Sequence, residues 1–288
     1  MEDRAVVATG MIDLHTHTTA SDGTVAPPDL IREALELRLE ALAITDHDIL
    51  AGYDQAAPMA GELDLIAGIE LSTKYGGKSV HLLGYFLSGP PPADFRTWLL
   101  RQQASRKDRN RRLVQRLNSL GIEITLPEVE ARGGVLTGRP HFARFLVEKG
   151  YVKTPQEAFD EYLDESAKGY VDRQEVQLSE GIAIIAASGG MPVIAHPVRI
   201  HREPERVAAA VAEMKEMGLQ GIEAYHSDHS GADTSFFEDL ARRLDLQVTG
   251  GSDYHGTVKA RIRLGTGYDG NLNIPRSVLD KLREAVSA

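Results

Sequence analysis

The sequence contains no cysteine, which excludes disulfides, thiolate metal sites and cysteine nucleophiles. Any bound metal ion must therefore be held by nitrogen and oxygen ligands. The chain also lacks an apolar run of the roughly 20 residues needed to span a bilayer, and residues 1–10 lack the apolar stretch of a signal peptide. We expect a cytoplasmic protein without a membrane partner, and we treat residues 1–10 as a tail without an assigned function.

Positive charge is in the minority, because 32 Lys and Arg residues stand against 42 Asp and Glu residues and the net charge is −10. This balance argues against a protein that coats nucleic acid non-specifically, although it allows a local basic patch. The shares of hydrophobic residues, 42%, and charged residues, 26%, are those of an ordinary globular protein. Disordered and collagen-like classes are thereby excluded.

Short apolar runs alternate with amphipathic stretches from Met11 onward, which is typical of strand–helix units around a parallel sheet. Helices are predicted at residues 28–39 and 203–217, among others. Strands are predicted at residues 11–14, 41–45, 65–69, 79–85, 191–195, 221–224 and 246–249. Seven such strands favour an α/β barrel.

The alternation of predicted strands and helices stops at a proline-rich stretch, residues 89–92, and about ninety mostly helical residues follow. We expect a small inserted helical domain at residues 88–177, between the barrel segments 11–87 and 178–288. Its first helix, predicted at residues 94–120, carries eight Arg and Lys residues against two Asp residues. Such a helix fits either a solvated face or a basic patch.

Histidine and carboxylate side chains gather at six of the predicted strand ends. In a parallel barrel the carboxyl ends of the strands form one face, where active sites are built. A single buried histidine is usually a hydrogen-bonded core residue, but burying this many ionisable groups without a cation would be very costly. We therefore predict a metal cluster. The residues are His15 and His17, His47, Glu70, His81, His196, and Asp253 with His255.

The motifs around these residues resemble those of the PHP superfamily of phosphoesterases. They are DLHTH at 13–17, SDG at 21–23, TDHD at 45–48, GIE at 68–70, VHL at 80–82, AHP at 195–197 and SDYH at 252–255. The resemblance implies a distorted seven-stranded (β/α)7 TIM-like barrel. The insertion, with GRPHFAR at 138–144 and KGYV at 168–171, resembles the subgroup that removes the 3'-phosphate from nucleoside 3',5'-bisphosphates. Relatives of that subgroup trim RNA from the 5' end.

The resemblance further implies nine ligands for two to three divalent metal ions. One ion would be held by His15, His17, Glu70 and Asp253; a second by Glu70, His81 and His196; a third by Asp22, His47 and His255. Asp22 could instead be a plain turn residue. Nitrogen and oxygen ligands suit Mn²⁺, Fe²⁺ or Zn²⁺, of which we expect Mn²⁺. The three carboxylates only partly offset three divalent ions, so the pocket would attract phosphate.

In the expected reaction a hydroxide bridging two metal ions attacks phosphorus, so no protein nucleophile is required. Asp253 or His229 would move a proton near the leaving oxygen, although His229 also fits a helix-capping loop. His201 and His226 could lie near the site, but nothing in the sequence distinguishes them from solvated loop histidines. The residues expected to bind the second phosphate, each of which could instead be a surface residue, are Arg139, His141, Lys168 and Arg199.

The predicted substrate is a nucleoside 3',5'-bisphosphate such as 3',5'-bisphosphoadenosine, with short single-stranded RNA as a related substrate. Histidinol phosphate or another small phosphomonoester is the nearer alternative, but the basic insertion favours a nucleotide. A non-catalytic accessory module is a distant alternative, because all nine ligand positions are filled. No protein partner is inferred.

Overall fold

The structure is a computed structural model that describes residues 11–133, 135–173 and 175–287. The tail assigned to residues 1–10 lies outside the described residues. Within the described part of the chain, no helix is both long and apolar enough to cross a bilayer. The cytoplasmic location stays a prediction.

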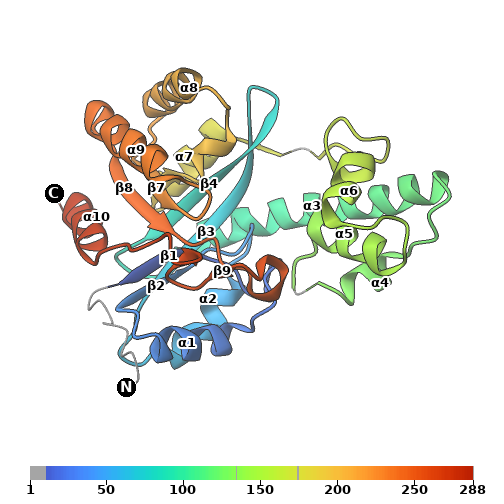
Figure 1. Ribbon diagram of the computed structural model, residues 1–288, viewed down its shortest axis with the longest axis horizontal. Helices are drawn as coiled ribbons and strands as arrows, with labels where there is room; N and C mark the ends of the chain where they lie inside the picture. The colour runs from blue at the N-terminus through green and yellow to red at the C-terminus, as the bar shows by residue number, and fades with distance from the viewer. Residues whose placement is uncertain (1–10, 134, 174, 288) are drawn as a thin grey trace.

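Strands β1, β2, β3, β4, β6, β7 and β8 follow one another, in this order, in a sheet that curls into a nearly closed barrel (Figure 1). Their bounds are Ile12–Thr16, Ala41–Ile44, Asp64–Tyr75, Lys78–Phe86, Met191–Ile194, Gly221–His226 and Gln247–Gly251. The ends meet where the amide nitrogen of Asp253 donates to the carbonyl oxygen of His15 at 2.9 Å. The seven-stranded TIM-like barrel predicted from the sequence is confirmed.

A parallel sheet was predicted, but strand β4 runs antiparallel to both of its neighbours, β3 and β6. The cause is a tight turn at Gly76 and Gly77, whose φ angles of 55° and 80° suit glycine and send the chain straight back along β3. His81 therefore lies in the first half of β4, opposite Ser72, and not at a carboxyl end. Because β4 is reversed, this half lies at the edge where its parallel neighbours end.

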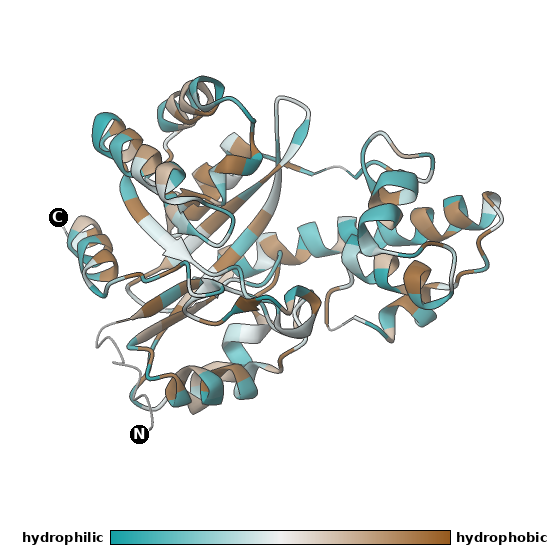
Figure 2. Cartoon of the chain, in the orientation of Figure 1, coloured by the Kyte–Doolittle hydropathy of each residue, from teal (hydrophilic) through white to brown (hydrophobic). Residues whose placement is uncertain are grey.

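Helices pack on the outside of the barrel (Figure 1). In α8, for example, Val207, Val211 and Met214 are buried in the core, and polar residues occupy the outer face of the helix (Figure 2). Helix α1 ends before its predicted end, since Arg38 has a left-handed φ of 57°. The helices are α1 (Pro27–Glu36), α2 (Ala51–Ala56), α7 (Leu178–Ala187), α8 (Pro204–Glu216), α9 (Gly231–Leu244) and α10 (Ser277–Ser287).

A helical lobe projects from the barrel between β4 and β6 (Figure 1). Helix α3 extends outward, and the remaining helices pack beside its far half around a separate core that includes Leu117, Phe142 and Phe145. The short strand β5 (Val176–Gln177) returns the chain to the barrel by pairing with β3. The borders at residues 88 and 177 stay a prediction. The lobe contains α3 (Ala93–Ser119), α4 (Leu126–Glu130), α5 (Arg139–Glu148), α6 (Pro155–Ala158) and the π-helical turn η2 (Phe159–Leu163).

A buried carboxylate, Asp48, ties this lobe to the barrel. Arg106 of α3 pairs with it, and Nη1 of Arg173 lies 3.4 Å from its Oδ2. The amide nitrogen of Ser72 in β3 donates to its Oδ1 at 2.8 Å. Burial alone would raise the pKa of Asp48, but the two guanidinium groups hold it well below its usual range.

Candidate metal centre

Strand β1 positions two buried imidazoles, because alternate residues of a strand point to the same face. These are His15 and His17. The carboxylate of Asp13 accepts hydrogen bonds from Ser252 Oγ at 2.5 Å and from the amide nitrogen of Gly265 at 2.8 Å, which fastens β1 to the chain beyond β8. A Cβ on Gly251 would lie 2.3 Å from Cβ of His15, so the close approach of β8 requires glycine there.

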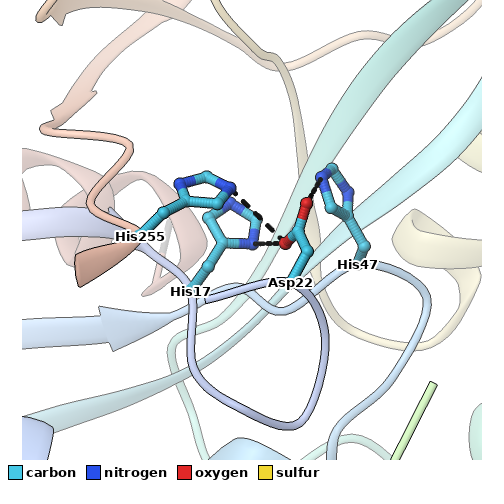
Figure 3. A group of neighbouring side chains, drawn as sticks. All are labelled: His17, Asp22, His47 and His255. Atoms are coloured by element: carbon cyan, nitrogen blue, oxygen red, sulfur yellow. Dashed lines mark ion pairs between the residues drawn. The ribbon is translucent and has the colours of Figure 1, made fainter. Parts of the chain in front are cut away.

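Asp22 reaches the cluster on the loop after β1. A second buried carboxylate, Asp46, shapes this loop by accepting hydrogen bonds from the amide nitrogen of Thr18 at 2.8 Å and from Oγ of Ser21 at 2.6 Å. Figure 3 shows the Asp22 carboxylate facing three imidazoles. Its oxygens lie 3.5 Å from Nδ1 of His17, 3.7 Å from Nε2 of His47 and 3.4 Å from Nε2 of His255.

Glu70, near the middle of β3, is the central carboxylate and is 1% exposed. Its Oε2 lies 3.3 Å from Nε2 of His15, 3.1 Å from Nε2 of His17 and 3.2 Å from Nδ1 of His47. Its Oε1 lies 2.9 Å from Nδ1 of His81 and 3.0 Å from Nε2 of His196. One carboxylate therefore faces five imidazoles, a geometry suited to a bridging ligand.

Asp253 completes the cluster from the chain after β8. Its Oδ1 lies 3.5 Å from Nε2 of His17 and 3.4 Å from Nδ1 of His255. Its Oδ2 faces the other way, toward Nζ of Lys259 at 2.6 Å and Nη2 of Arg199 at 3.2 Å. The sequence offered no pattern that marks Lys259.

The donor atoms fit divalent metal ions. Buried nitrogens of His15, His17 and His47 have no hydrogen-bond partner, although such atoms are costly to leave unsatisfied. Burial also lowers the pKa of His47 to about 3, despite the nearby carboxylates, and so favours the neutral form that binds metal. Four groups have ligand atoms within 4.8 Å of one another: His17, Asp22, His47 and His255; His15, His17 and Glu70; His15, His226 and Asp253; and His47, Glu70 and His81.

These groups contain eight of the nine expected ligands, and the ninth, His196, lies with its Nε2 3.0 Å from Oε1 of Glu70. The resemblance implies separate ligand sets for the individual ions, but the sets overlap in the structure. His17, for example, faces Asp22 as well as Glu70. His47 likewise lies between Asp22 and Glu70. The division of the ligands among individual ions stays a prediction.

Glu223 was missed by the sequence reasoning. It is buried in β7, where its carboxylate accepts from Nδ1 of His15 at 2.8 Å and from the amide nitrogen of His196 at 2.7 Å. A proton on Nδ1 leaves Nε2 of His15 free to face the cluster, which is how carboxylates orient metal-binding histidines. The available signal was an acidic residue inside an otherwise apolar predicted strand.

Of the two histidines that the sequence left open between the site and a solvated loop, His226 is fully buried and lies at the cluster. Its Nδ1 accepts from the amide nitrogen of Asp228 at 3.0 Å, and its Nε2 faces Oδ2 of Asp253 at 3.5 Å. His201 lies outside the cluster, beside Glu203 and Arg206.

The cluster opens into a cavity of about 570 Å³ between the barrel and the helical lobe. Residues of helix α5 and of the η2 turn line the cavity, as do residues 257–259 beside the barrel. A smaller pocket of about 160 Å³ shares Asp22, His47 and His81 with the cavity and adds two arginines, Arg106 and Arg139. The two hollows thus meet at the metal-ligand candidates.

Three of the predicted substrate-binding residues line these hollows. Arg139 is half-buried in the smaller pocket. His141 lines the larger cavity, and burial lowers its pKa. Arg199 lines the cavity while Nε donates to Asp228 at 2.9 Å. Lys168 is exposed outside both linings, with Nζ 3.3 Å from Glu161.

His229, the predicted proton carrier, is buried behind the cluster. Its Nδ1 lies 2.8 Å from the carbonyl oxygen of Ala224, and its ring packs against Phe237 and His226. It is absent from the described lining of both hollows. Its role stays a prediction.

A barrel with a cluster of histidines and carboxylates beneath an open cavity defines a metal-dependent hydrolase. The model of the PHP domain family matches residues 13–217. The chain belongs to this family, as its motifs predict, and is a metal-dependent phosphoesterase.

Three relatives illustrate the similarity. The chain is 35% identical over 252 residues to the 5'-3' exoribonuclease Rnm of Escherichia coli, covering 84% of each protein. It is 33% identical over 248 residues to the 3',5'-nucleoside bisphosphate phosphatase of Chromobacterium violaceum, covering 85% of this chain and 87% of that protein. A solved structure from Bifidobacterium adolescentis, of a protein inferred to be a metal-dependent phosphoesterase, has a TM-score of 0.78 and 33% identity, and the match covers 96% of this chain and 95% of that one.

Proposed function

We propose that the protein hydrolyses the 3'-phosphate of nucleoside 3',5'-bisphosphates, such as 3',5'-bisphosphoadenosine, to give the 5'-monophosphate and phosphate. The observation that carries this proposal is the arginine-containing pocket that adjoins the metal-ligand cluster. A bisphosphate needs one anion site at the reacting phosphorus and a second within the length of a ribose. One relative described above is named a 3',5'-nucleoside bisphosphate phosphatase and another a 5'-3' exoribonuclease, so both names concern phosphate esters of nucleotides.

The electrostatics around the smaller pocket favour a second phosphate. Asp48 pairs with Arg106 and Arg173, and Oε1 of Glu175 lies 3.7 Å from Nε of Arg173. Arg109 is buried near these groups and near Arg139, so four arginines face two carboxylates. Burial and the other three guanidinium groups lower the pKa of Arg109 well below its usual range. The excess of positive charge would be relieved by a phosphate anion, whereas the amine of histidinol phosphate would be repelled.

We also propose that short 5'-phosphorylated RNA binds in the same register. Its 5'-phosphate would occupy the arginine-containing pocket, and the first phosphodiester would lie at the cluster. Cleavage of the bond to the 3'-oxygen would then release a 5'-mononucleotide. One arrangement of groups thus serves both substrates.

Two to three divalent ions, with Mn²⁺ expected and Fe²⁺ or Zn²⁺ compatible, would be held by the nine ligand candidates. When bound, such ions activate water as a nucleophile and neutralise charge on the phosphoryl oxygens. The protein contributes by fixing the imidazoles, with Glu70 at the centre and Glu223 orienting His15. Lys259 and Arg199 line the cavity beside Asp253, where their N–H groups can donate to phosphate oxygens.

Proton delivery to the leaving 3'-oxygen is proposed to involve Asp253, the predicted group nearest the cavity. His229 could act only at a distance. Its ring centroid lies 5.3 Å from that of His226, and Nε2 of His226 lies 3.5 Å from Oδ2 of Asp253. Nε2 of His229 has no hydrogen-bond partner, and Nδ1 of His226 already accepts from an amide nitrogen, so the described contacts supply no proton route from His229 to Asp253.

The test is phosphate release by the Mn²⁺-loaded protein from 3',5'-bisphosphoadenosine and histidinol phosphate, together with mononucleotide release from a short 5'-phosphorylated RNA. We expect kcat/KM for the bisphosphate to exceed that for histidinol phosphate by about tenfold or more, the value of one charge-assisted contact. A preference for histidinol phosphate would contradict the proposal.

A further inference from the structure

The cavity has one aromatic side chain that the proposed reaction does not use. Among the described residues that line the large cavity and the smaller pocket, Phe159 is the only phenylalanine, and no tyrosine or tryptophan is present. Phe159 borders both hollows, as does Pro140. It therefore lies beside the junction where the two hollows share metal-ligand candidates.

Local structure fixes this position. Phe159 begins the π-helical turn η2, in which the amide nitrogen of Asp164 donates to its carbonyl oxygen at 2.9 Å. The flanking Ala158 and Leu163 are buried in the core of the lobe, and Phe159 packs against that core while staying half-buried. Single π-helical turns are rare and frequently occur at functional sites.

Apolar residues of the lobe line the cavity together with Phe159, alongside the ion-paired side chains of Arg144 and Glu148. The apolar residues are Pro140, Val147 and Pro155, and Val258, which is 53% exposed, adds to the lining from beside the barrel. The arginine-containing pocket shares Phe159 and Pro140 with this lining. An anion site beside an aromatic ring and apolar side chains matches a nucleotide, which joins a phosphate to a planar base.

We propose that Phe159 stacks on the nucleobase of the substrate, an inference that rests on the proposed function and names the part of the substrate that the lobe binds. Stacking on an aromatic ring suits every base, because each base has a π-face. The stacking contact is the same in the bound substrate and in the transition state, so it should lower KM and leave kcat unchanged.

The experiment compares ligands with and without a base. Titration calorimetry of the Mn²⁺-loaded protein gives Kd for 5'-AMP and for ribose 5-phosphate, and steady-state kinetics compare 3',5'-bisphosphoadenosine with an abasic 3',5'-bisphosphate. The variants are Phe159→Leu, Phe159→Tyr, which keeps the ring, and Phe236→Leu. The last is a matched control, because Phe236 is also half-buried and lies outside both linings.

We expect Phe159→Leu to weaken 5'-AMP binding, and to raise KM for the nucleoside bisphosphate, by about 5- to 100-fold, the usual range for one stacked base. Ligands without a base should be unaffected, and Phe159→Tyr and Phe236→Leu should resemble the wild type. Equal losses for ligands with and without a base, or no loss for either, would overturn the stacking site. Normal 5'-AMP binding through Phe159 without phosphate release from the bisphosphate would instead overturn the proposed reaction.

Discussion

Arg139→Ala should impair the bisphosphate reaction selectively. Arg139 begins α5, and its side chain lines the smaller pocket beside Asp22, His47 and His81. Among the described residues no carboxylate forms an ion pair with Arg139, whose Nη1 donates to the carbonyl oxygen of Leu163 at a long 3.4 Å. Its charge is therefore available to a substrate phosphate, unlike that of Arg106.

The expected loss follows from one charge-assisted contact of about 1.5–3 kcal/mol, or about ten- to a hundredfold in kcat/KM for 3',5'-bisphosphoadenosine. A simple phosphate monoester lacks the second phosphate, so its kcat/KM should be nearly unchanged. Arg139→Lys should recover little, because an ammonium group cannot reproduce the bidentate guanidinium. Arg101→Ala, at an exposed position of α3 outside both linings, is the matched control.

The assay is steady-state phosphate release on both substrates, with metal content measured for every variant. If both substrates fall equally while metal content is unchanged, Arg139 acts in the catalytic centre or in folding. If neither falls, Arg139 is a solvated arginine. Either result would refute its assignment to the second phosphate.

Three further predictions concern the cluster and its support. Glu70→Gln should lose bound metal and activity, measured by elemental analysis and phosphate release, far more than His201→Ala; full metal content would exclude a bridging Glu70. Glu223→Gln should weaken metal affinity about 10- to 100-fold in a chelator competition, as is typical for partners of ligating histidines, and unchanged affinity would contradict its orienting role. Asp48→Asn should lower the free energy of unfolding by about 3–5 kcal/mol near pH 7, because it leaves buried arginines unpaired. The folded-state pKa of Asp48 is depressed, so this difference should shrink as pH falls below the unfolded value of about 3.9, and a difference under about 1 kcal/mol in urea unfolding at pH 7 would count against the pairing.

Much of the barrel was predictable, because its apolar runs are regularly spaced and polar residues follow them. His15, His17 and His47 come directly at or after such runs, and they meet because neighbouring parallel strands end at one edge. The direction of β4 was not predicted, since an apolar run looks the same in a parallel and an antiparallel strand. The glycine pair before it was the available signal.

Contacts across long separations could not be predicted in this way. Arg106 and Asp48 pair across 58 positions, and Lys259 reaches Asp253 from the 3₁₀ turn η4 (Gly256–Lys259). Such pairs depend on how the lobe and the loops pack, which no local periodicity encodes. Phe159 is a similar case, because an isolated phenylalanine in a helical stretch usually indicates core packing.

The most direct measurement is phosphorus NMR of the product that the Mn²⁺-loaded protein forms from 3',5'-bisphosphoadenosine. With the 3'-phosphate at the cluster and the 5'-phosphate beside Arg139, we predict 5'-AMP and inorganic phosphate. If 3'-AMP is the main product, the two phosphates bind in the opposite order. Failure to release phosphate from either position would contradict the proposed reaction itself.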